Sequence, residues 1–458
     1  MKNLLSFLLL ISINCLGQTA TQQVLMALNK LKTESPYINA DISFTLLDNE
    51  TGQLLVEKNK DIPLAPASTL KTFTTATALK LLGSNFQYKT RIEFKGQIFQ
   101  HHAKGVLMVY GSGDPSLGSD RFNETKPEVV KQQIRAGLQK AGIESFEGSV
   151  QIINSLFTDE GINTGWLDED IGNYYGAGIY PFNWKENKFE LNLVPTQTSF
   201  EVSSNSAAYD NHRDFCIELT QKDGASTEEA FAFVEKNKVC SYVIRGVLSA
   251  KEKVQNMQLA RLHPDHDFQL ELSKYLQQEF PFHKINSIGT GRDTQLTVTT
   301  LVSPPLSKLV YWCNQKSLNL YAEAFCKTLA VKQFHQGNWP MGIATLVRYA
   351  KALGINTSSI HLKDGCGLAP ENRITTHILA SLLRHYTKEQ FFPTFLESLP
   401  SINGLIMKSG YIGGTRSYAG YITLRNGRKA SFAFIVHNYT CSPKEVKIQM
   451  FRILDLLK

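Results

Sequence analysis

The chain has 458 residues, a formal net charge of +7 and 42% hydrophobic residues. This length is enough for about three average domains, and the ordinary composition excludes the fibrous and the intrinsically disordered classes. The positive charge does not gather in a basic run. We find no aromatic–basic platform or other nucleic-acid motif, so nucleic acid is not an expected partner.

The first segment, MKNLLSFLLLISINCLGQ, predicts an export signal. One lysine precedes an apolar run from Leu4 to Ile13, which is too short to span a membrane stably. Cleavage after Gly17 would suit a signal peptide of residues 1–17, and lipid attachment at Cys15 is the alternative. No later segment reaches the ~18 apolar residues of a membrane helix. We therefore expect an exported, periplasmic protein that is soluble or loosely membrane-associated, without an integral membrane segment once the signal is removed.

The spacing of apolar and turn residues near the N-terminus predicts a helix, a hairpin and a second helix. Residues 24–31 carry apolar side chains at helical spacing, and the apolar runs 42–48 and 53–58 flank an Asn/Gly turn. From Ser68 the spacing becomes helical again, and Gly83 is a stop signal.

The middle of the chain favours β structure. Apolar residues alternate from Phe86 to Phe94, and a helical pattern occupies residues 126–142. Residues 91–299 are thus predicted to form a β-rich insertion with some helix, in which further strands are expected at 105–110, 149–154 and 189–194.

The C-terminal part predicts helices from about Leu306, then a buried strand at 429–438 and a helix that begins at a Ser442 capping box. A sheet covered by the N- and C-terminal helices fits both ends of the chain.

Seven cysteines are present, and none forms a CxxC pair or a metal-ligand spacing. Export would permit disulfides. Cys216 and Cys240 could pair with each other, or they could be buried apolar residues.

Ser68 and Lys71 lie three positions apart where the first long helix is expected to begin. Such residues share one helix face, and free backbone N–H groups lie at a helix start. A serine hydroxyl becomes a strong nucleophile only when a base takes its proton. A lysine can be that base only when its amine is neutral, which requires burial or a nearby cation.

Two later stretches strengthen this interpretation. They are Ser317-Leu318-Asn319 and Lys408-Ser409-Gly410, and the three motifs in this order form the signature set of serine penicillin-binding proteins and β-lactamases. Ser317 can pass a proton between Lys71 and a leaving amine. Asn319 can hold a substrate amide and fix Lys71.

The third stretch has its own expected roles. Lys408 supplies a second cation beside Lys71 and attracts a substrate carboxylate. Gly410 lets a substrate backbone lie against the strand edge, and the backbone N–H groups of Ser68 and Tyr411 would bind the oxyanion.

The flanks of these motifs resemble one family, the D-alanyl-D-alanine carboxypeptidase/endopeptidases, which are class C low-molecular-mass penicillin-binding proteins and serine DD-peptidases. The similar stretches are PLAPASTLKTFTTATALKLLG, SPPLSKLVYWCNQKSLNLYAE, DGCGLAPENRIT and MKSGYIGGTRSYAGY, and the likeness covers almost the whole mature chain. The resemblance implies an α+β fold with a penicillin-recognising, transpeptidase-like domain, in which helices cover an antiparallel sheet. This domain would comprise residues 18–90 and 300–458, and the insertion 91–299 would form two small domains.

The resemblance also implies substrate contacts outside the three motifs. The stretch GWLDEDIGNYYGAG is similar to a family segment in which an acidic residue meets the free amine of diaminopimelate. Asp170 is the best match and Asp168 the neighbouring choice, while an exposed acidic loop is the alternative.

The sequence departs from the family pattern at three positions. Ser409 stands where Thr is usual and keeps the hydroxyl. Tyr411 replaces a small hydroxyl residue, which puts a side-chain contact to the substrate carboxylate in doubt. Cys366 replaces a serine near the expected active site, where a structural thiol is favoured over a reactive one.

The function implied is that of an exported serine DD-peptidase without cofactor or metal. It would cleave D-alanyl-D-alanine termini and/or D-alanyl–diaminopimelyl cross-links of peptidoglycan stem peptides through an acyl-enzyme on Ser68, and β-lactams would be its covalent inhibitors. A β-lactamase-like hydrolase is one alternative, but we find no dedicated water-activating base. A non-catalytic peptidoglycan-binding scaffold is another, against which the intact motifs argue.

Overall fold

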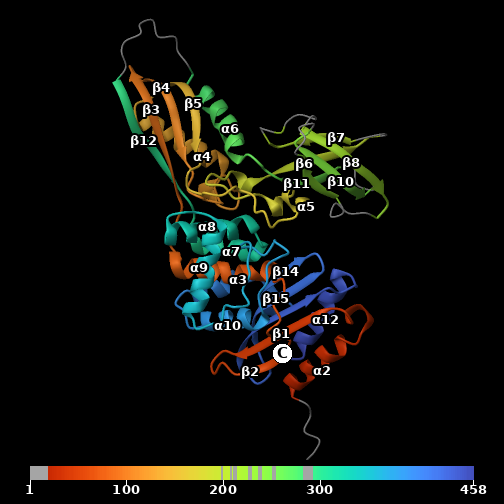
Figure 1. Ribbon diagram of the computed structural model, residues 1–458. Coiled ribbons are helices and arrows are strands. Elements are labelled where there is room, and N and C mark those ends of the chain that lie inside the picture. Colours follow the sequence, from red (N-terminus) through yellow and green to blue (C-terminus); the bar gives the residue numbers. More distant parts are fainter. Residues whose placement is uncertain are drawn as a thin grey trace, which may run out of the picture.

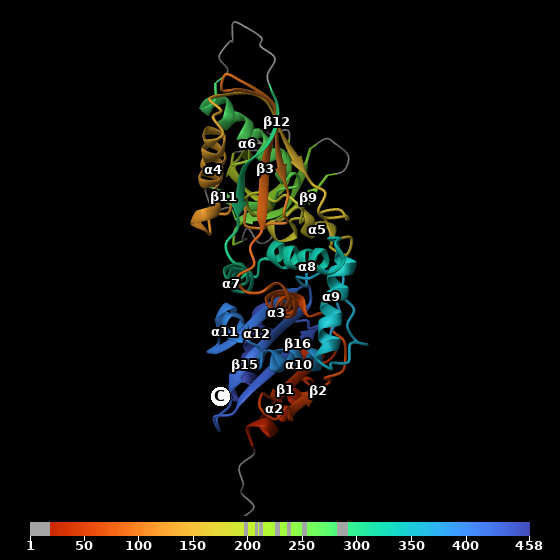
Figure 2. The same cartoon turned by 90° about the vertical axis from the view of Figure 1, so that its left-hand side faces the viewer.

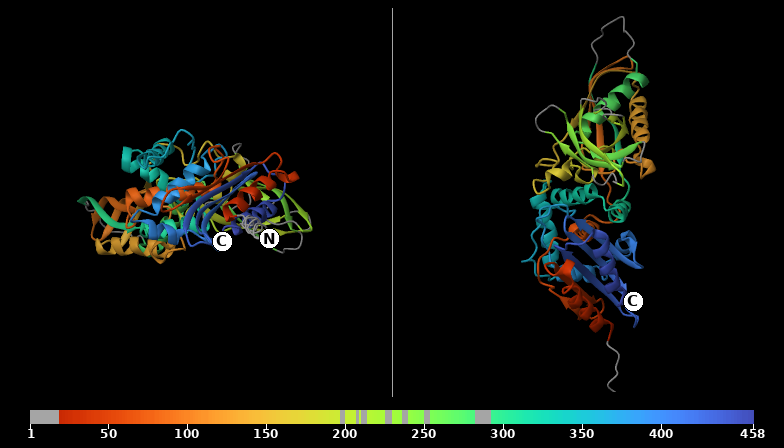
Figure 3. Two further views of the ribbon diagram at one scale, coloured as in Figure 1. Left: turned by 90° about the horizontal axis from the view of Figure 1, so that it is seen from below. Right: turned by 90° about the vertical axis from the view of Figure 1, so that its right-hand side faces the viewer.

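The computed structural model describes residues 19–281 and 292–458, apart from 197–199, 207–208, 210–213, 225–229, 236–239 and 250–253. The expected signal peptide lies outside the described residues. The chain forms two lobes that are stacked end to end, and the views from the side show the same elongated arrangement (Figures 1, 2 and 3). Among the described residues, no helix is both long and apolar enough to cross a membrane.

The first lobe is built on a six-stranded antiparallel sheet that joins the two ends of the chain. Its central strand β16 is buried along almost its whole length, as the apolar run 429–438 predicts. In order across the sheet, the strands are β13 (Ser401–Ile402), β14 (Leu405–Ile412), β15 (Thr415–Thr423), β16 (Lys429–His437), β1 (Asp41–Asp48) and β2 (Leu54–Lys58).

Helices cover both faces of this sheet. Val24, Leu28 and Leu31 of α2 (Ala20–Leu31) join α12 (Pro443–Asp455) on one face, and Ser442 caps α12 as predicted. The other face meets the larger helical core, which contains α3 (Lys71–Leu82), α7 (Leu306–Lys316), α8 (Asn319–Phe334), α9 (Trp339–Ala352), α10 (Thr376–Tyr386) and α11 (Phe392–Ser398).

Two details differ from the simple helical pattern. Ser68 lies in a 3₁₀ turn, η2 (Ala67–Leu70), directly before α3 rather than in its first turn. Helix α3 is buried on all sides from Lys71 to Leu79, because other helices and the sheet surround it. Gly83 ends it with a φ of 90°, a backbone conformation that glycine adopts readily.

The second lobe contains the inserted residues and has two hydrophobic cores. One core lies between a four-stranded sheet and the helices α4 (Pro127–Lys140) and α6 (Pro264–Glu279). The strands of this sheet, in order, are β12 (Arg292–Val302), β3 (Lys89–Phe99), β4 (His102–Tyr110) and β5 (Ser145–Ile153).

The other core belongs to two three-stranded sheets. Cys216 and Cys240 form a disulfide here, so they are paired with each other and are not simply buried apolar residues. We propose that the two cores mark two small domains within the insertion 91–299. The sheets comprise β11 (Gln255–Ala260), β6 (Lys188–Pro195) and β7 (Phe200–Ser204), and β8 (Phe215–Lys222), β10 (Tyr242–Ser249) and β9 (Ala230–Val234).

Short helical segments complete the fold. Helix α8 lies where the lobes meet, with α3 beneath it (Figures 1 and 2). The remaining segments are α5 (Asp168–Ile171), η1 (Ser35–Tyr37), η3 (Asn123–Thr125), η4 (Tyr174–Gly176) and η5 (Lys185–Asn187).

Candidate active site

The Lys71 side chain is fully buried and lies at the centre of the site. Its Nζ lies 2.8 Å from Ser68 Oγ, 2.6 Å from Asn319 Oδ1 and 2.8 Å from the carbonyl oxygen of Cys366. The last two partners are acceptors only, so they occupy two N–H groups of the amine. The third position faces Ser68. A neutral Lys71 would therefore direct its lone pair at the Ser68 hydroxyl.

Ser317 and Asn319 are positioned by the junction of α7 and α8. Ser317 ends α7 in the left-handed conformation, with a φ of 57°, and Asn319 begins α8 two residues later. Both ends of the Asn319 amide are fixed, since Oδ1 accepts from Lys71 and Nδ2 donates to the carbonyl of Tyr175 at 2.7 Å. The inserted lobe thus orients a side chain of the first lobe.

Lys408 points from β14 toward Ser317. Its Nζ donates to Ser317 Oγ at 3.0 Å and to the carbonyl of Ser409 at 2.8 Å, and the side chain is buried. Burial, and then the positive charge of Lys71, lowers the pKa of Lys408 to about 7. Two lysine amines thus share one poorly hydrated space, and the positive charge there favours entry of an anionic group.

Gly410 permits close approach of β14 to the turn that carries Ser68. A Cβ atom at this position would overlap Ser417 Oγ and lie only 2.8 Å from the backbone nitrogen of Ser68. Ser417 Oγ also donates to the carbonyl of Pro66 at 2.6 Å, which ties β15 to the same turn. Strand β14 and the turn that carries Ser68 are therefore in direct contact.

The outer edge of β14 is open beside this contact. Strand β13 pairs only with Leu405 and Ile406, and the rest of that edge has no strand partner within the described residues. The Tyr411 side chain is 51% exposed there. An extended peptide could add to this edge as another strand, with its backbone next to Ser68.

Asp170 lies on α5, and its neighbour Tyr175 connects it to the site. Burial, followed by the negative charge of Glu169, raises the pKa of Asp170 to about 6, while a hydrogen bond from the Tyr175 side chain opposes this shift. The carbonyl of Tyr175 holds Asn319. Asp168 is exposed at the start of α5, whereas Asp170 is half-buried and accepts from the Tyr175 side chain. Of the two carboxylates, Asp170 is therefore the one linked to the site.

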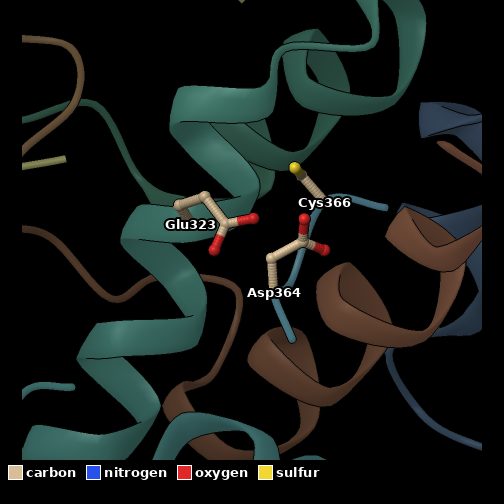
Figure 4. Close-up of side chains that lie close together, drawn as sticks. All are labelled: Glu323, Asp364 and Cys366. Atoms are coloured by element: carbon tan, nitrogen blue, oxygen red, sulfur yellow. The ribbon is translucent and has the colours of Figure 1, made fainter. Parts of the chain in front are cut away.

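Three buried side chains, Glu323, Asp364 and Cys366, lie close together (Figure 4), and the backbone carbonyl of Cys366 accepts from Lys71. Burial raises the pKa of the Cys366 thiol well above its ordinary value, which fits a structural thiol, while its carbonyl serves Lys71. Ligand atoms of the three lie within 4.8 Å of one another, as a metal site would require. Both carboxylates, however, are already engaged by protein donors.

These donors explain the cluster without an ion. Asp364 accepts from the backbone of Gly367 and Ala369, and Glu323 accepts from Gly365 and from the Trp339 ring at 2.5 Å. The cluster holds the 364–369 loop, and with it the carbonyl that accepts from Lys71. Glu323 and Asp364 were not predicted as site residues, although each lies at one end of a stretch that resembles the family, SPPLSKLVYWCNQKSLNLYAE and DGCGLAPENRIT.

The inserted lobe also contacts α8 and the 364–369 loop directly. The buried Lys327 pairs with the partly exposed Asp159, with 2.7 Å from Nζ to the carboxylate. Hydrogen bonds also join Tyr321 to Glu186, Trp166 to Asp364 and Asn163 to the carbonyl of Lys363. Trp166 and Asp170 belong to one stretch, so this part of the insertion both supports the site and borders it.

A serine hydroxyl beside a buried lysine, with a strand edge open to a peptide, is the arrangement of a serine peptidase that works through an acyl-enzyme. Residues 24–457 match the D-Ala-D-Ala carboxypeptidase 3 (S13) family, and the chain belongs to this family. It is thus a serine-type DD-peptidase, which confirms the resemblance seen in its motifs.

Individual relatives agree with this assignment. The chain is 24% identical to the D-alanyl-D-alanine carboxypeptidase DacB of Haemophilus influenzae over 89% of its length and 88% of the relative. It is 32% identical to carboxypeptidase Rv3627c of Mycobacterium tuberculosis over 85% and 75% of the two chains. The crystal structure of penicillin binding protein 4 from Haemophilus influenzae has the same fold, with a TM-score of 0.77 and 19% identity, covering 94% of this chain and 98% of that one.

Proposed function

We propose that the protein cleaves D-alanyl-D-alanine termini and/or D-alanyl–diaminopimelyl cross-links of peptidoglycan, with Ser68 as the nucleophile. The observation that carries the residue assignment is the 2.8 Å distance between Lys71 Nζ and Ser68 Oγ. The other two hydrogen-bond positions of Nζ are occupied by Asn319 Oδ1 and the carbonyl oxygen of Cys366.

Acylation begins with neutral Lys71 taking the Ser68 proton. The Ser68 oxygen attacks the carbonyl carbon of the penultimate D-alanine, and the backbone N–H groups of Ser68 and Tyr411 bind the oxyanion. Collapse of this intermediate breaks the peptide bond. Ser317 passes the proton that Lys71 took from Ser68 on to the leaving amine, which leaves Lys71 neutral, and its hydrogen bond to Lys408 supports this role.

Deacylation is the reverse exchange, with water as the nucleophile. Lys71 takes a proton from the water, directly or through Ser317, as the water attacks the ester carbonyl. It then returns this proton to the Ser68 oxygen as the ester breaks. Lys71 is thus returned to the neutral state.

Substrate binding uses the groups around the open edge of β14. Lys408 attracts the terminal carboxylate, assisted by the hydroxyl of Ser409, and Gly410 admits the substrate backbone. Asp170, when ionised, pairs with the free amine of the diaminopimelyl side chain. This role is supported by its link through Tyr175 to Asn319.

The proposal extends to β-lactams and to location. A penicillin presents a strained amide and a carboxylate, so it should acylate Ser68. A related fold, that of the Haemophilus protein, has been seen complexed with a β-lactam. We place the protein in the periplasm, where peptidoglycan lies and where the Cys216–Cys240 disulfide would be stable.

Defined muropeptides test the proposal. The purified protein should release D-alanine from pentapeptide stems, split D-alanyl–diaminopimelyl dimers, or do both, and the Ser68→Ala variant should do neither. Intact substrates after incubation with the wild-type protein, or the same products from the variant, would contradict it.

A further inference from the structure

A cavity that the mechanism does not use lies where the two lobes join. It has a volume of about 580 Å³, within the roughly 300–1,000 Å³ of small-molecule sites. Its walls come from the C-terminal ends of α3 and α8 and from strands by which the chain enters and leaves the insertion. The lining residues are Leu82, Phe86, Lys89, Arg91, Tyr110, Gly111, Ser112, Leu156, Thr300, Thr328, Val331 and Lys332.

The lining combines an apolar wall with one sign of charge. Leu82, Phe86, Leu156 and Val331 are only half-buried, so their apolar surface remains partly open to water. The charged residues of the lining are all cations, and neither aspartate nor glutamate is among them. Burial of the apolar wall by a ligand would be favourable, and the cations would select a negatively charged head group.

The cations are not equally available. Arg91 is paired with Glu93 at 3.2 Å and stacks over the Tyr110 ring at 4.4 Å. Lys89 and Lys332 are exposed, and within the part of the chain that the structure describes neither takes part in an ion pair. These two lysines come from different lobes, Lys89 from β3 and Lys332 from the last turn of α8.

We propose that this cavity binds a single-chain amphiphilic anion, namely a fatty carboxylate. Its tail covers the apolar wall, and its carboxylate lies between Lys89 and Lys332. Lys332 lies in the last turn of α8, so its charge offsets the partial negative charge of the carbonyl end of that helix.

The position of the cavity gives such a ligand a structural effect. Helices α3 and α8 carry Lys71 and Asn319 at their N-terminal ends, and the cavity touches the opposite end of each helix. A bound fatty carboxylate therefore bridges the insertion and the two helices that supply the catalytic motifs.

Calorimetric titration of the full chain with dodecanoate, kept below its micelle concentration, tests the proposal. One dodecanoate should bind per chain, and dodecyltrimethylammonium, with the same tail and the opposite charge, should neither bind nor compete. The double variant Lys89→Glu/Lys332→Glu should weaken binding about tenfold or more, the size expected when two surface charge contacts are reversed.

The matched control is Lys351→Glu/Lys444→Glu, which changes the net charge equally at exposed lysines outside the cavity. It should bind dodecanoate as the wild type does, and both double variants should keep the wild-type rate of acylation by penicillin. If the charge reversal prevents folding, Lys89→Gln/Lys332→Gln replaces it. No dodecanoate binding by the wild type, equal binding of the cationic amphiphile, or unchanged affinity in the Lys89/Lys332 variants would overturn the proposal.

Discussion

Lys408 carries an electrostatic cost that makes the stability of the protein depend on pH. Its folded-state pKa of about 7 lies below the ordinary value of 10.5, because of burial first and the charge of Lys71 second. Between these two pH values the unfolded chain binds the proton more readily than the folded one. The destabilising contribution of Lys408 is therefore full below pH 7 and disappears as the pH rises toward 10.5.

A Lys408→Met variant isolates this contribution. We expect the difference in unfolding free energy, variant minus wild type, to be most favourable to the variant below pH 7. It should fall by on the order of 4 kcal/mol between pH 7 and 10.5. Urea denaturation at a series of pH values measures it, with the exposed Lys444→Met as control. A difference that does not change with pH would show that Lys408 is charged throughout this range.

Asp170 gives a second prediction at the residue scale, on substrate choice. Its pKa is raised to about 6, so the carboxylate is ionised above that pH and can pair with an amine. Asp170→Asn should lower kcat/KM about tenfold for stem peptides with a free diaminopimelyl amine, the size of one charged contact. The wild-type value should rise with pH through about 6.

Acylated-amine versions of the same peptides provide the control. They should be cleaved equally by the wild type and by Asp170→Asn. If the two kinds of substrate respond alike to the substitution, Asp170 acts on the structure of the site and does not contact the amine.

At the scale of elements, the close contact between β14 and η2 leaves no room for a side chain at Gly410. A Cβ atom at Gly410 would meet the backbone nitrogen of Ser68 at 2.8 Å, whereas one at Gly413, three residues later, would meet nothing within 4 Å. We expect Gly410→Ala to separate strand and nucleophile and to slow acylation about 100-fold, and Gly413→Ala to leave it unchanged.

Stopped-flow acylation by a chromogenic β-lactam measures both variants, and circular dichroism checks that they fold. A Gly410→Ala protein that reacts as fast as Gly413→Ala would mean that β14 can move away without cost.

Local patterns predicted some elements well and could not show others. The hairpin of β1 and β2, strand β16 and the capped helix α12 were predicted within a few residues, because period, turn residues and caps are local signals. The α+β class was also predicted correctly. The left-handed Ser317, the carbonyl of Tyr175 and the donors around Asp364 could not be predicted, since tertiary packing alone creates them.

At the scale of the whole molecule, the insertion contacts α8 and so helps to position Asn319, one of the proposed site residues. Lys327 on α8 is completely buried, pairs with Asp159 of the insertion and lies 3.5 Å from the centre of the Trp339 ring. Lys327→Met would remove this ion pair and leave the partly exposed Asp159 carboxylate with the backbone N–H of Trp339 as a donor. We expect a loss of about 2 kcal/mol in unfolding free energy, the size of one hydrogen bond to a charged group, measured by urea denaturation with tryptophan fluorescence.

Lys332→Met on the same helix is the matched control, because that side chain is exposed and should change stability by less than about 0.5 kcal/mol. Equal stability of the two variants would show that the ion pair does not hold α8 against the insertion.

The central claim is that Ser68 is the nucleophile and Lys71 its base, and intact-mass measurement after incubation with a penicillin tests it most directly. The wild type should gain the mass of one penicillin and keep it, because the rigid leaving group stays attached and blocks water. Ser68→Ala should gain nothing. A folded Lys71→Arg protein should also gain nothing, since arginine keeps its proton. Labelling that survives Ser68→Ala, or near-normal labelling of Lys71→Arg, would contradict the account.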